Sequence, residues 1–384
     1  MADVIVVGGG PAGLHAAYLL GKEGFDVRVL EEHSSIGSPV HCTGIVAAEA
    51  FKEFDIQEST ALHPLHNVRF YAPSGTSFEY RTRDAEVFVI DRRSFDQQLC
   101  DRAVAAGVTV TTSSKVFDIR TDDQRALVVT SNGECFQCRI IVLACGADYV
   151  LQRRLGLGVP NHFLQSAQIE TRSDLLDAVE IHTGKDIAPG GFGWAVPVIR
   201  NDQSYVRLGL MCASRVDHYF ANFRSRIGKQ WNLESSAIPR RKILPLGPIP
   251  KTFGNRIIAV GDAAGIVKPT TGGGIYYGLV SASIAARTVT AGLRSNDISS
   301  SFLAQYDKAW RNAFQAEIES QLMFRKLATR LNDTEIDQLV ALAKYNGLRP
   351  LIRMTARFNH QRTLINAVLG HPGARRILLK ELFS

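Results

Sequence analysis

The sequence predicts an α/β fold: a Rossmann-like domain that carries an inserted mixed or antiparallel sheet and is followed by a C-terminal helical region. Three patterns predict it: a strand, glycine turn and helix at the start, short segments between Gly, Pro and Asn-Asp turns in the middle, and apolar residues at helical spacing toward the end. We expect the Rossmann-like domain to comprise residues 1–66, 85–160 and 250–296. Residues 67–84 and 161–249 should form the sheet domain, and 297–384 the helical region.

The first βαβ unit supports the Rossmann-like prediction. Residues 4–7 are a β-branched run that breaks into Gly8-Gly9-Gly10-Pro11-Ala12-Gly13, and a helical pattern and a second apolar run follow. In such a turn, Gly8 permits the tight bend, Gly10 lets a pyrophosphate approach the backbone, and Gly13 lets the helix pack closely on the strand. Glu31 stands about twenty residues farther on, where a carboxylate binds ribose hydroxyls. The unit therefore predicts a dinucleotide site.

Composition narrows the class of protein. The 384 residues are 45% hydrophobic and 21% charged, with a net charge of +7, which is typical of a globular protein with two or three domains. No apolar run reaches the roughly 18 residues that cross a bilayer. No Lys/Arg block, zinc-finger spacing or RNA-binding aromatic signature occurs, so we expect no nucleic-acid partner. Six cysteines without a signal-peptide pattern predict a cytoplasmic location, with peripheral contact on the inner face of the membrane left open.

The segment after Glu31 alternates between helix and strand patterns. Residues 45–58 predict a helix, 68–80 a hairpin, 87–90 a strand, and the following segment a helix that ends near Ala106. Residues 108–112, 116–119 and 140–144 predict strands. The isolated Cys135-Phe136-Gln137-Cys138 pattern is expected on a strand, and since metal sites usually need a second such pair or histidines, we predict no metal site.

The second half changes from strands to helices. Strands are expected at 166–171, 178–182, 194–199, 205–211 and 257–260, and a helix at 275–293. Residues 302–331, 334–345 and 348 to the C-terminus predict helices. Arginines are interspersed there, which indicates either a solvated helical cap or a surface that contacts anionic lipid headgroups: Arg349, Arg353, Arg357, Arg362, Arg375 and Arg376.

Three distant segments fit one ligand. The first glycine turn suits a pyrophosphate and an adenosine ribose. Gly261-Asp262 follows a strand, where the carboxylate can bind ribityl hydroxyls, and Gly272-Gly273-Gly274 begins a helix whose positive end suits a delocalised anion such as reduced flavin. This division suits FAD better than NAD. Because only one complete glycine fingerprint exists, a second tightly held dinucleotide has no evident domain of its own.

On these motifs the sequence resembles the p-hydroxybenzoate-hydroxylase-like FAD superfamily, which shares the first glycine turn, an Asp91-Arg92 segment and the later Gly261-Asp262 segment. Within it, the sequence is most similar to the geranylgeranyl reductase family, including archaeal digeranylgeranylglycerophospholipid reductases. The most specific pieces are His41-Cys42-Thr43-Gly44, Phe192-Gly193-Trp194-Ala195-Val196-Pro197 and residues 269–275. The resemblance implies an FAD-binding domain of the GR2 type.

The resemblance also assigns roles to residues. Cys42, expected beside the isoalloxazine ring, is implied in the reaction, and Phe192, Trp194 and Pro197 are expected to line the substrate cavity. The predicted FAD contacts are Gly8, Gly10, Ala12, Gly13, Glu31, Glu32, Cys42, Thr43, Arg92, Val116 (through its backbone), Gly261, Asp262, Gly272, Gly273, Gly274 and Ile275.

The implied function is reduction of C=C bonds in a polyprenyl chain carried by a diphosphate, a lipid or a quinone. An unactivated alkene offers no carbonyl to polarise, so the protein must supply alignment, a dry pocket and a proton donor, for which Cys42 is the candidate. NAD(P)H or a reduced ferredoxin, bound transiently, would supply the electrons. Two alternatives remain open: a flavin-dependent monooxygenase or halogenase of the same fold, and a membrane-associated electron-transfer flavoprotein.

Overall fold

The computed structural model describes residues 1–174, 176–231, 233, 237–345 and 347–380. It divides the chain into two compact units, each assembled from three segments. Unit 1 comprises Met1–Val40, Arg92–His162 and Pro245–Ile318, and unit 2 comprises His41–Asp91, Phe163–Leu244 and Glu319–Ser384. The sequence-based division into an FAD domain, a sheet domain and a helical region stays a prediction.

Unit 1 is built on a largely parallel sheet. The strand order is β17-β18-β11-β1-β2-β8, and β9 and β10 extend β11 as antiparallel neighbours. β1 lies between two parallel partners, with Val6 opposite Val142 on one side and Val29 on the other. Because such strands are covered on both faces, their sequences are nearly continuous apolar runs. The strands are β1 (Ala2–Val7), β2 (Val27–Leu30), β8 (Thr109–Thr111), β9 (Val116–Thr121), β10 (Ala126–Thr130), β11 (Cys135–Leu143), β17 (Phe253–Gly254) and β18 (Ile257–Ala259).

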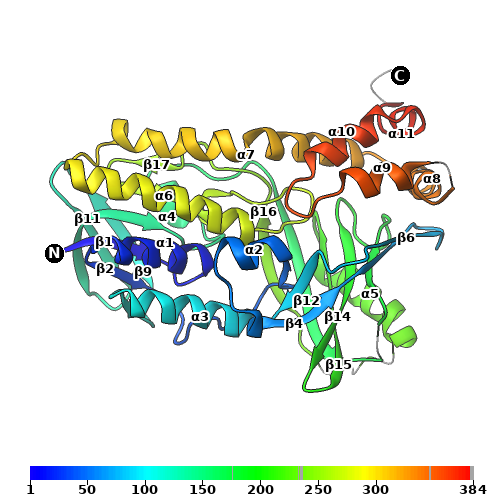
Figure 1. Ribbon diagram of the computed structural model, residues 1–384, viewed down its shortest axis with the longest axis horizontal. Coiled ribbons are helices and arrows are strands. Elements are labelled where there is room, and N and C mark those ends of the chain that lie inside the picture. The colour runs from blue at the N-terminus through cyan, green and yellow to red at the C-terminus, as the bar shows by residue number, and fades with distance from the viewer. Residues whose placement is uncertain (175, 232, 234–236, 346, 381–384) are drawn as a thin grey trace. The chain divides into compact units, whose positions relative to one another are not determined.

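Helices α1 (Pro11–Lys22) and α6 (Ile275–Ser295) pack against each other in unit 1 (Figure 1). Their N-terminal ends approach closely because small residues meet there: a Cβ at Gly261 would lie 3.0 Å from the Cβ of Ala12, and one at Gly278 3.5 Å from it. The other elements of this unit are α3 (Arg92–Ala105), α4 (Val150–Arg154), the 3-10 helix η2 (Gly261–Ala264) and the first part of α7 (Ser300–Ala328).

Unit 2 contains two sheets. The larger has the order β16-β12-β15-β14-β13-β5-β6 and is antiparallel except where β13 pairs with β5, and the smaller has the order β3-β7-β4. The strands are β3 (Ile45–Ala47), β4 (Ala61–Leu65), β5 (Asn67–Tyr71), β6 (Ser77–Arg81), β7 (Val87–Ile90), β12 (Phe163–Arg172), β13 (Val179–His182), β14 (Phe192–Arg200), β15 (Gln203–Cys212) and β16 (Arg240–Pro245).

The larger sheet of unit 2 is covered on both faces. Ala195 packs in a cluster with Phe220 and Phe223 of helix α5 (Val216–Trp231), whereas its neighbour Val196 packs with Val89 of the small sheet. Consecutive strand residues face opposite sides, so the two clusters lie on opposite faces. The same alternation puts Phe192 and Trp194 on the face of Val196.

The C-terminal helices form their own apolar cluster. Helices α8 (Asp333–Tyr345), α9 (Leu348–Thr355), α10 (Arg362–Gly370) and α11 (Pro372–Leu378) pack with the end of α7, and Leu331, Leu348 and Leu378 are buried among them. This mutual packing accounts for the helical spacing of apolar residues in the sequence. Among the residues described, no helix combines the length and the apolar character needed to cross a membrane.

Most predicted elements are confirmed, including the hairpin of β5 and β6 and the strand location of Cys135 and Cys138, but three predictions were wrong. Residues 45–58 begin as strand β3 before the short helix α2 (Ala48–Glu53), because residues 45–47 pair with β7. The predicted helix from Leu348 is three helices, since the chain is extended at Ala356 and at His371. Its last residues, 381–384, lie outside the described residues. Helix α5 was missed among the strands although Val216, Phe220, Phe223 and Ile227 have helical spacing. The 3-10 helix η1 (Glu58–Thr60) completes the elements described.

Candidate functional site

The glycine turn of unit 1 requires residues without a side chain at two positions, Gly8 and Gly13. Gly8 has φ +108°, and a Cβ there would lie 2.4 Å from the carbonyl oxygen of Ala144. A Cβ at Gly13 would lie 2.2 Å from the carbonyl oxygen of Gly8. Both distances are far below van der Waals contact with rigid backbone, so glycine alone lets α1 start this close to β1 and β11.

Gly10 differs because a Cβ there would meet no atom within 4 Å. It is the N-cap residue of α1, and no side chain caps that helix end. Glu31, only 9% exposed, lies at the end of β2, where its Oε2 accepts a hydrogen bond from the Gly9 N–H at 2.6 Å. Its Oε1 accepts from the backbone N–H of His33 at 2.9 Å. The structure thus joins Glu31 to the glycine turn and leaves open space at the helix N-terminus.

The second predicted segment also comes together within unit 1. A Cβ at Gly274, the N-cap of α6, would lie 2.5 Å from the Oδ1 of Asp262, so the Asp262 carboxylate lies directly over the start of that helix. Gly261 has φ +57° and Gly272 φ +69°, values that favour glycine. Ile275 is the first residue of α6.

Sequence reasoning missed a buried cation in this segment. Lys268 is 3% exposed, and its Cε would lie 2.8 Å from a Cβ at Gly273. Its backbone N–H donates to the Gly273 carbonyl at 3.0 Å, which closes the loop before α6. The available signal was a lysine directly after the apolar pair Ile266-Val267.

Three other predicted cofactor residues have separate surroundings. Arg92 begins α3 and pairs with Asp96, with Nη2 2.9 Å from Oδ2. Glu32 pairs with Lys115 at 2.9 Å, and Val116 begins β9 directly after that lysine. The cofactor role of these three residues stays a prediction.

In unit 2, the indole of Trp194 lies across its neighbouring strand. Trp194 is paired with Gly209, and Gly209 is also paired with Gln168 on the next strand. A Cβ at Gly209 would lie 2.5 Å from the indole, so the glycine provides the space that the ring occupies. The Trp194 Nε1–H then donates to the Oε1 of Gln168 at 3.1 Å.

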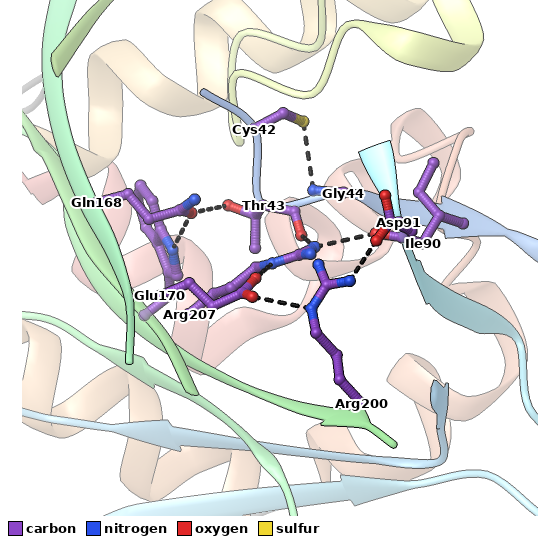
Figure 2. Close-up of polar contacts among 10 residues, drawn as sticks. Cys42, Thr43, Gly44, Ile90, Asp91, Gln168, Glu170, Arg200 and Arg207 are labelled. Atoms are coloured by element: carbon purple, nitrogen blue, oxygen red, sulfur yellow. Dashed lines mark hydrogen bonds and ion pairs between the residues drawn. The ribbon is translucent and has the colours of Figure 1, made fainter. Parts of the chain in front are cut away.

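The segment Cys42-Thr43-Gly44 is fixed to the same sheet. The Thr43 hydroxyl donates to the Oε1 of Gln168 at 2.7 Å, and its carbonyl accepts from the Nη1 of Arg207 at 2.5 Å. The Gly44 carbonyl accepts from the Ile90 N–H at 2.8 Å, and the Cys42 Sγ accepts from the Gly44 N–H at 3.3 Å. Figure 2 shows the thiol at the end of this held segment.

Arg207 is the centre of a charged network. It is 1% exposed, its Nη1 also donates to the Ile90 carbonyl at 3.1 Å, and its Nε donates to Glu170 at 2.7 Å. Glu170 in turn accepts from Arg200, which pairs with Asp91. Burial disfavours the charged Glu170, but the two arginines outweigh burial and lower the pKa of its carboxyl. The buried guanidinium is therefore balanced by charge and is hydrogen-bonded through its Nε and Nη1 atoms.

Two rings of the aromatic string pack together: Phe192 and Trp194 form an edge-to-face pair with ring centroids 5.9 Å apart. Pro197 lines a cavity of about 400 Å³, formed by the ends of β4 to β6. The substrate-lining role of these three residues stays a prediction. Sequence reasoning missed Gln168, Glu170, Arg200 and Arg207, and the one readable signal was Arg207 within the apolar run Val206 to Met211.

The comparisons with known proteins agree with this geometry. Residues 3–358 match the family model described as Lycopene cyclase protein. The chain is 30% identical to digeranylgeranylglycerophospholipid reductase 1 of Methanopyrus kandleri over 91% of this chain and 96% of that protein. It is 29% identical to the digeranylgeranylglycerophospholipid reductase of Methanocaldococcus jannaschii, over 88% of this chain and 89% of that protein. The chain belongs to the family of that model and to the family of the digeranylgeranylglycerophospholipid reductases.

Solved structures show that this reductase family member has the expected fold. A geranylgeranyl bacteriochlorophyll reductase-like protein from Thermoplasma acidophilum superposes with a TM-score of 0.86 at 22% identity, covering 100% of this chain and 98% of that one. A single-residue mutant of the halogenase PltM, in complex with FAD, gives a TM-score of 0.70 at 17% identity, covering 99% of this chain and 85% of that one. The predicted fold class is confirmed.

Proposed function

We propose that this protein is an FAD-dependent reductase that saturates C=C bonds in the polyprenyl chain of a lipid, a diphosphate or a quinone. The observation that carries this proposal is the 30% identity to a digeranylgeranylglycerophospholipid reductase along nearly the full length of both chains. The glycine turn, whose open helix N-terminus suits a dinucleotide, and the hydrogen-bonded Cys42 segment support it.

The residues of unit 1 fit FAD. The open space at Gly10 and the uncapped N-terminus of α1 suit a pyrophosphate. Glu31 would bind the ribose hydroxyls, Asp262 the ribityl hydroxyls, and the α6 N-terminus, with buried Lys268 beside it, the anionic edge of the ring. Bound FAD would supply the hydride. The remaining predicted contacts stay part of the proposal: Glu32, Cys42, Thr43, Arg92, Val116, Gly272, Gly273 and Ile275.

The residues of unit 2 would control the second half of the reaction. The Cys42 thiol would deliver the proton to the alkene carbon that does not receive hydride. Arg207 and Gln168 hold Thr43 from two sides, which restricts the position of that thiol. The rings of Phe192 and Trp194 would form an apolar wall that excludes water from the reacting bond.

A single-turnover experiment tests the function. The purified, FAD-loaded protein is reduced chemically without oxygen and mixed with a digeranylgeranylglyceryl phospholipid, while absorbance follows the flavin and mass spectrometry follows the lipid. We expect reoxidation of the flavin together with a gain of two hydrogen atoms per reduced bond. Reoxidation by a quinone with an unchanged prenyl chain would instead indicate an electron carrier, and incorporation of oxygen or halide after air is admitted would indicate a monooxygenase or halogenase.

The electron donor and the membrane contact belong to the same proposal. We propose NAD(P)H or a reduced ferredoxin as the transient donor, which anaerobic reduction of the FAD by each donor separately would distinguish. Peripheral contact with an anionic membrane is proposed because arginines such as Arg353 accompany the exposed Met354 on α9. Sedimentation with vesicles tests this contact.

A further inference from the structure

The cavity that Pro197 lines has no part in the function proposed above. It encloses about 400 Å³ within unit 2, where β4 ends, β5 begins and β6 ends. Its volume lies in the range of sites for small organic ligands. Leu65 and Pro197 are among its apolar lining residues, and the remainder of the lining is mainly polar and basic.

Four basic side chains line this cavity: His63, His66, Arg81 and Arg83. Arg81 and Arg83 are exposed side chains for which the described residues provide no ion pair. The one acid in the lining, Asp177, already binds Arg69, with its Oδ2 3.1 Å from Nη2. The cavity therefore has an excess of positive charge at neutral pH, which attracts an anion.

Within the described part of the chain, the two histidines of the cavity likewise lack a paired negative charge. Burial lowers the pKa of His63, and the nearby His66 lowers it further because two imidazolium groups repel each other. A bound anion would remove this repulsion. Among the described residues, no carboxylate forms a hydrogen bond or an ion pair with either imidazole.

A buried amide in the lining lacks a hydrogen-bond partner. Asn67 is 5% exposed, and its Oδ1 has no partner among the described residues. It is paired with Arg81 across β5 and β6, so the two side chains project from the same face of the sheet. A buried amide group without a partner is unfavourable unless a ligand or water binds it. Because rotation about the last side-chain bond exchanges its oxygen and nitrogen, this amide can face either a hydroxyl or an anionic oxygen.

We propose that this cavity is a binding site for a phosphate group. Guanidinium groups bind phosphate oxygens in pairs, and the imidazoles and the Asn67 amide supply further donors. The apolar residues on the other side suit the carbon part of a phosphate ester. The ligand is either a soluble phosphate compound or the headgroup of a phospholipid, and the site does not depend on the proposed reductase activity.

Calorimetric titration of the full-length protein with inorganic diphosphate tests the site directly. The test variant is Arg81→Gln/Arg83→Gln, and Arg226→Gln, an exposed arginine on α5, is the matched control. We expect binding to weaken at least about tenfold in the double variant, because each lost charge-assisted hydrogen bond changes affinity by about that factor. The control should bind as the wild type does.

A second variant and a second probe complete the design. Asn67→Asp places a negative charge in the cavity and should also weaken diphosphate binding, while circular dichroism verifies that each variant is folded. Vesicles of phosphatidylglycerol, with phosphatidylcholine vesicles as the control, identify the source of the phosphate group. If the wild type binds the vesicles and the double variant does not, the ligand is a lipid headgroup. If the wild type binds diphosphate but not the vesicles, the ligand is a soluble compound. Absence of binding of any phosphate probe to the wild type, or equal binding by the double variant, would overturn the proposal.

Discussion

The glycine turn of unit 1 and the Cys42 segment of unit 2 are positioned in opposite ways. The turn is shaped by the absence of side chains at Gly8 and Gly13 and by backbone contacts within one βαβ unit and its neighbouring strand. The Cys42 segment is held by long side chains, Gln168 and Arg207, from strands more than a hundred residues away. A backbone-built site tolerates change around it but not within it, whereas a site held by side chains depends on every residue that holds it.

The largest effect is expected at the centre of the side-chain network. Arg207→Met removes a buried cation that satisfies two carbonyl groups and Glu170, so the free energy of unfolding should fall by about 3–5 kcal/mol. Urea unfolding measures it. The exposed Arg226→Met should change stability by less than about 0.5 kcal/mol. An equally small change for Arg207→Met would contradict the view that this segment is held from a distance.

A matched pair of alanines tests the backbone-built site. Gly13→Ala should lower the free energy of unfolding by about 3 kcal/mol, because its Cβ meets the Gly8 carbonyl oxygen at 2.2 Å. Gly10→Ala should fold normally, since its Cβ meets open space. Its affinity for FAD should fall instead, and fluorescence titration of the apoprotein with FAD measures this. Normal FAD binding by Gly10→Ala would show that the pyrophosphate does not approach there.

The next effect concerns chemistry rather than stability. If the network exists to place the Cys42 thiol, Cys42→Ser should slow reoxidation of the reduced flavin by the prenyl lipid by about 100-fold, because loss of a general acid has that magnitude. Its unfolding curve should be unchanged. Cys135→Ser, at an exposed thiol, is the control. A Cys42→Ser protein with unchanged turnover would reduce Cys42 to a packing residue.

The two regions should also differ in their response to acid. Burial, and then the charge of Arg102, lowers the pKa of His15 on α1 from 6.5 to about 4. A lowered histidine pKa means that the unfolded chain binds the proton first, so stability is complete above 6.5 and is lost as pH falls toward 4. Between about pH 7 and about pH 5 the loss should be about 2 kcal/mol. His15→Gln should remove this loss in urea unfolding measured at both pH values. Glu170, whose pKa is lowered below the usual 4.5, contributes only in more acidic solution.

The smallest effect tests a single hydrogen bond of the network. Thr43→Val keeps the shape of the side chain but removes the donor to Gln168, so stability should fall by about 1 kcal/mol. The Trp194 Nε1–H still satisfies the Gln168 oxygen, which limits the loss. Alkylation of Cys42 by iodoacetamide should become faster as its segment loosens. A rate equal to that of the wild type would show that Arg207 alone fixes the thiol.

This contrast explains what the sequence could predict. The glycine turn, Glu31 and the strand that precedes Gly261 follow from local patterns, because their partners lie within one unit of secondary structure or are backbone atoms. Helix α5 was also readable from the spacing of Phe220 and Phe223. The contact of Asp262 with Gly274 could also be anticipated from the sequence, because both residues border the same loop.

The hydrogen-bond network around Thr43 could not be predicted from local sequence patterns. Arg207 and Gln168 reach it only through the register of β12, β14 and β15, which long-range pairing determines. A one-residue shift in that register would turn both side chains to the opposite face. The cavity beside Arg81 likewise depends on how three strand ends converge, and no motif marks that convergence.

Gly209 leaves free the space that the Trp194 indole occupies, so the residues at positions 194 and 209 depend on each other. The indole and any side chain at 209 would compete for the same space, with only 2.5 Å between them. Proteins of this fold with a larger residue at 209 must therefore carry a smaller one at 194, and the two should change together in evolution. A substitution of this tryptophan by a smaller residue would leave the space above Gly209 empty, so the two positions have to be replaced as a pair.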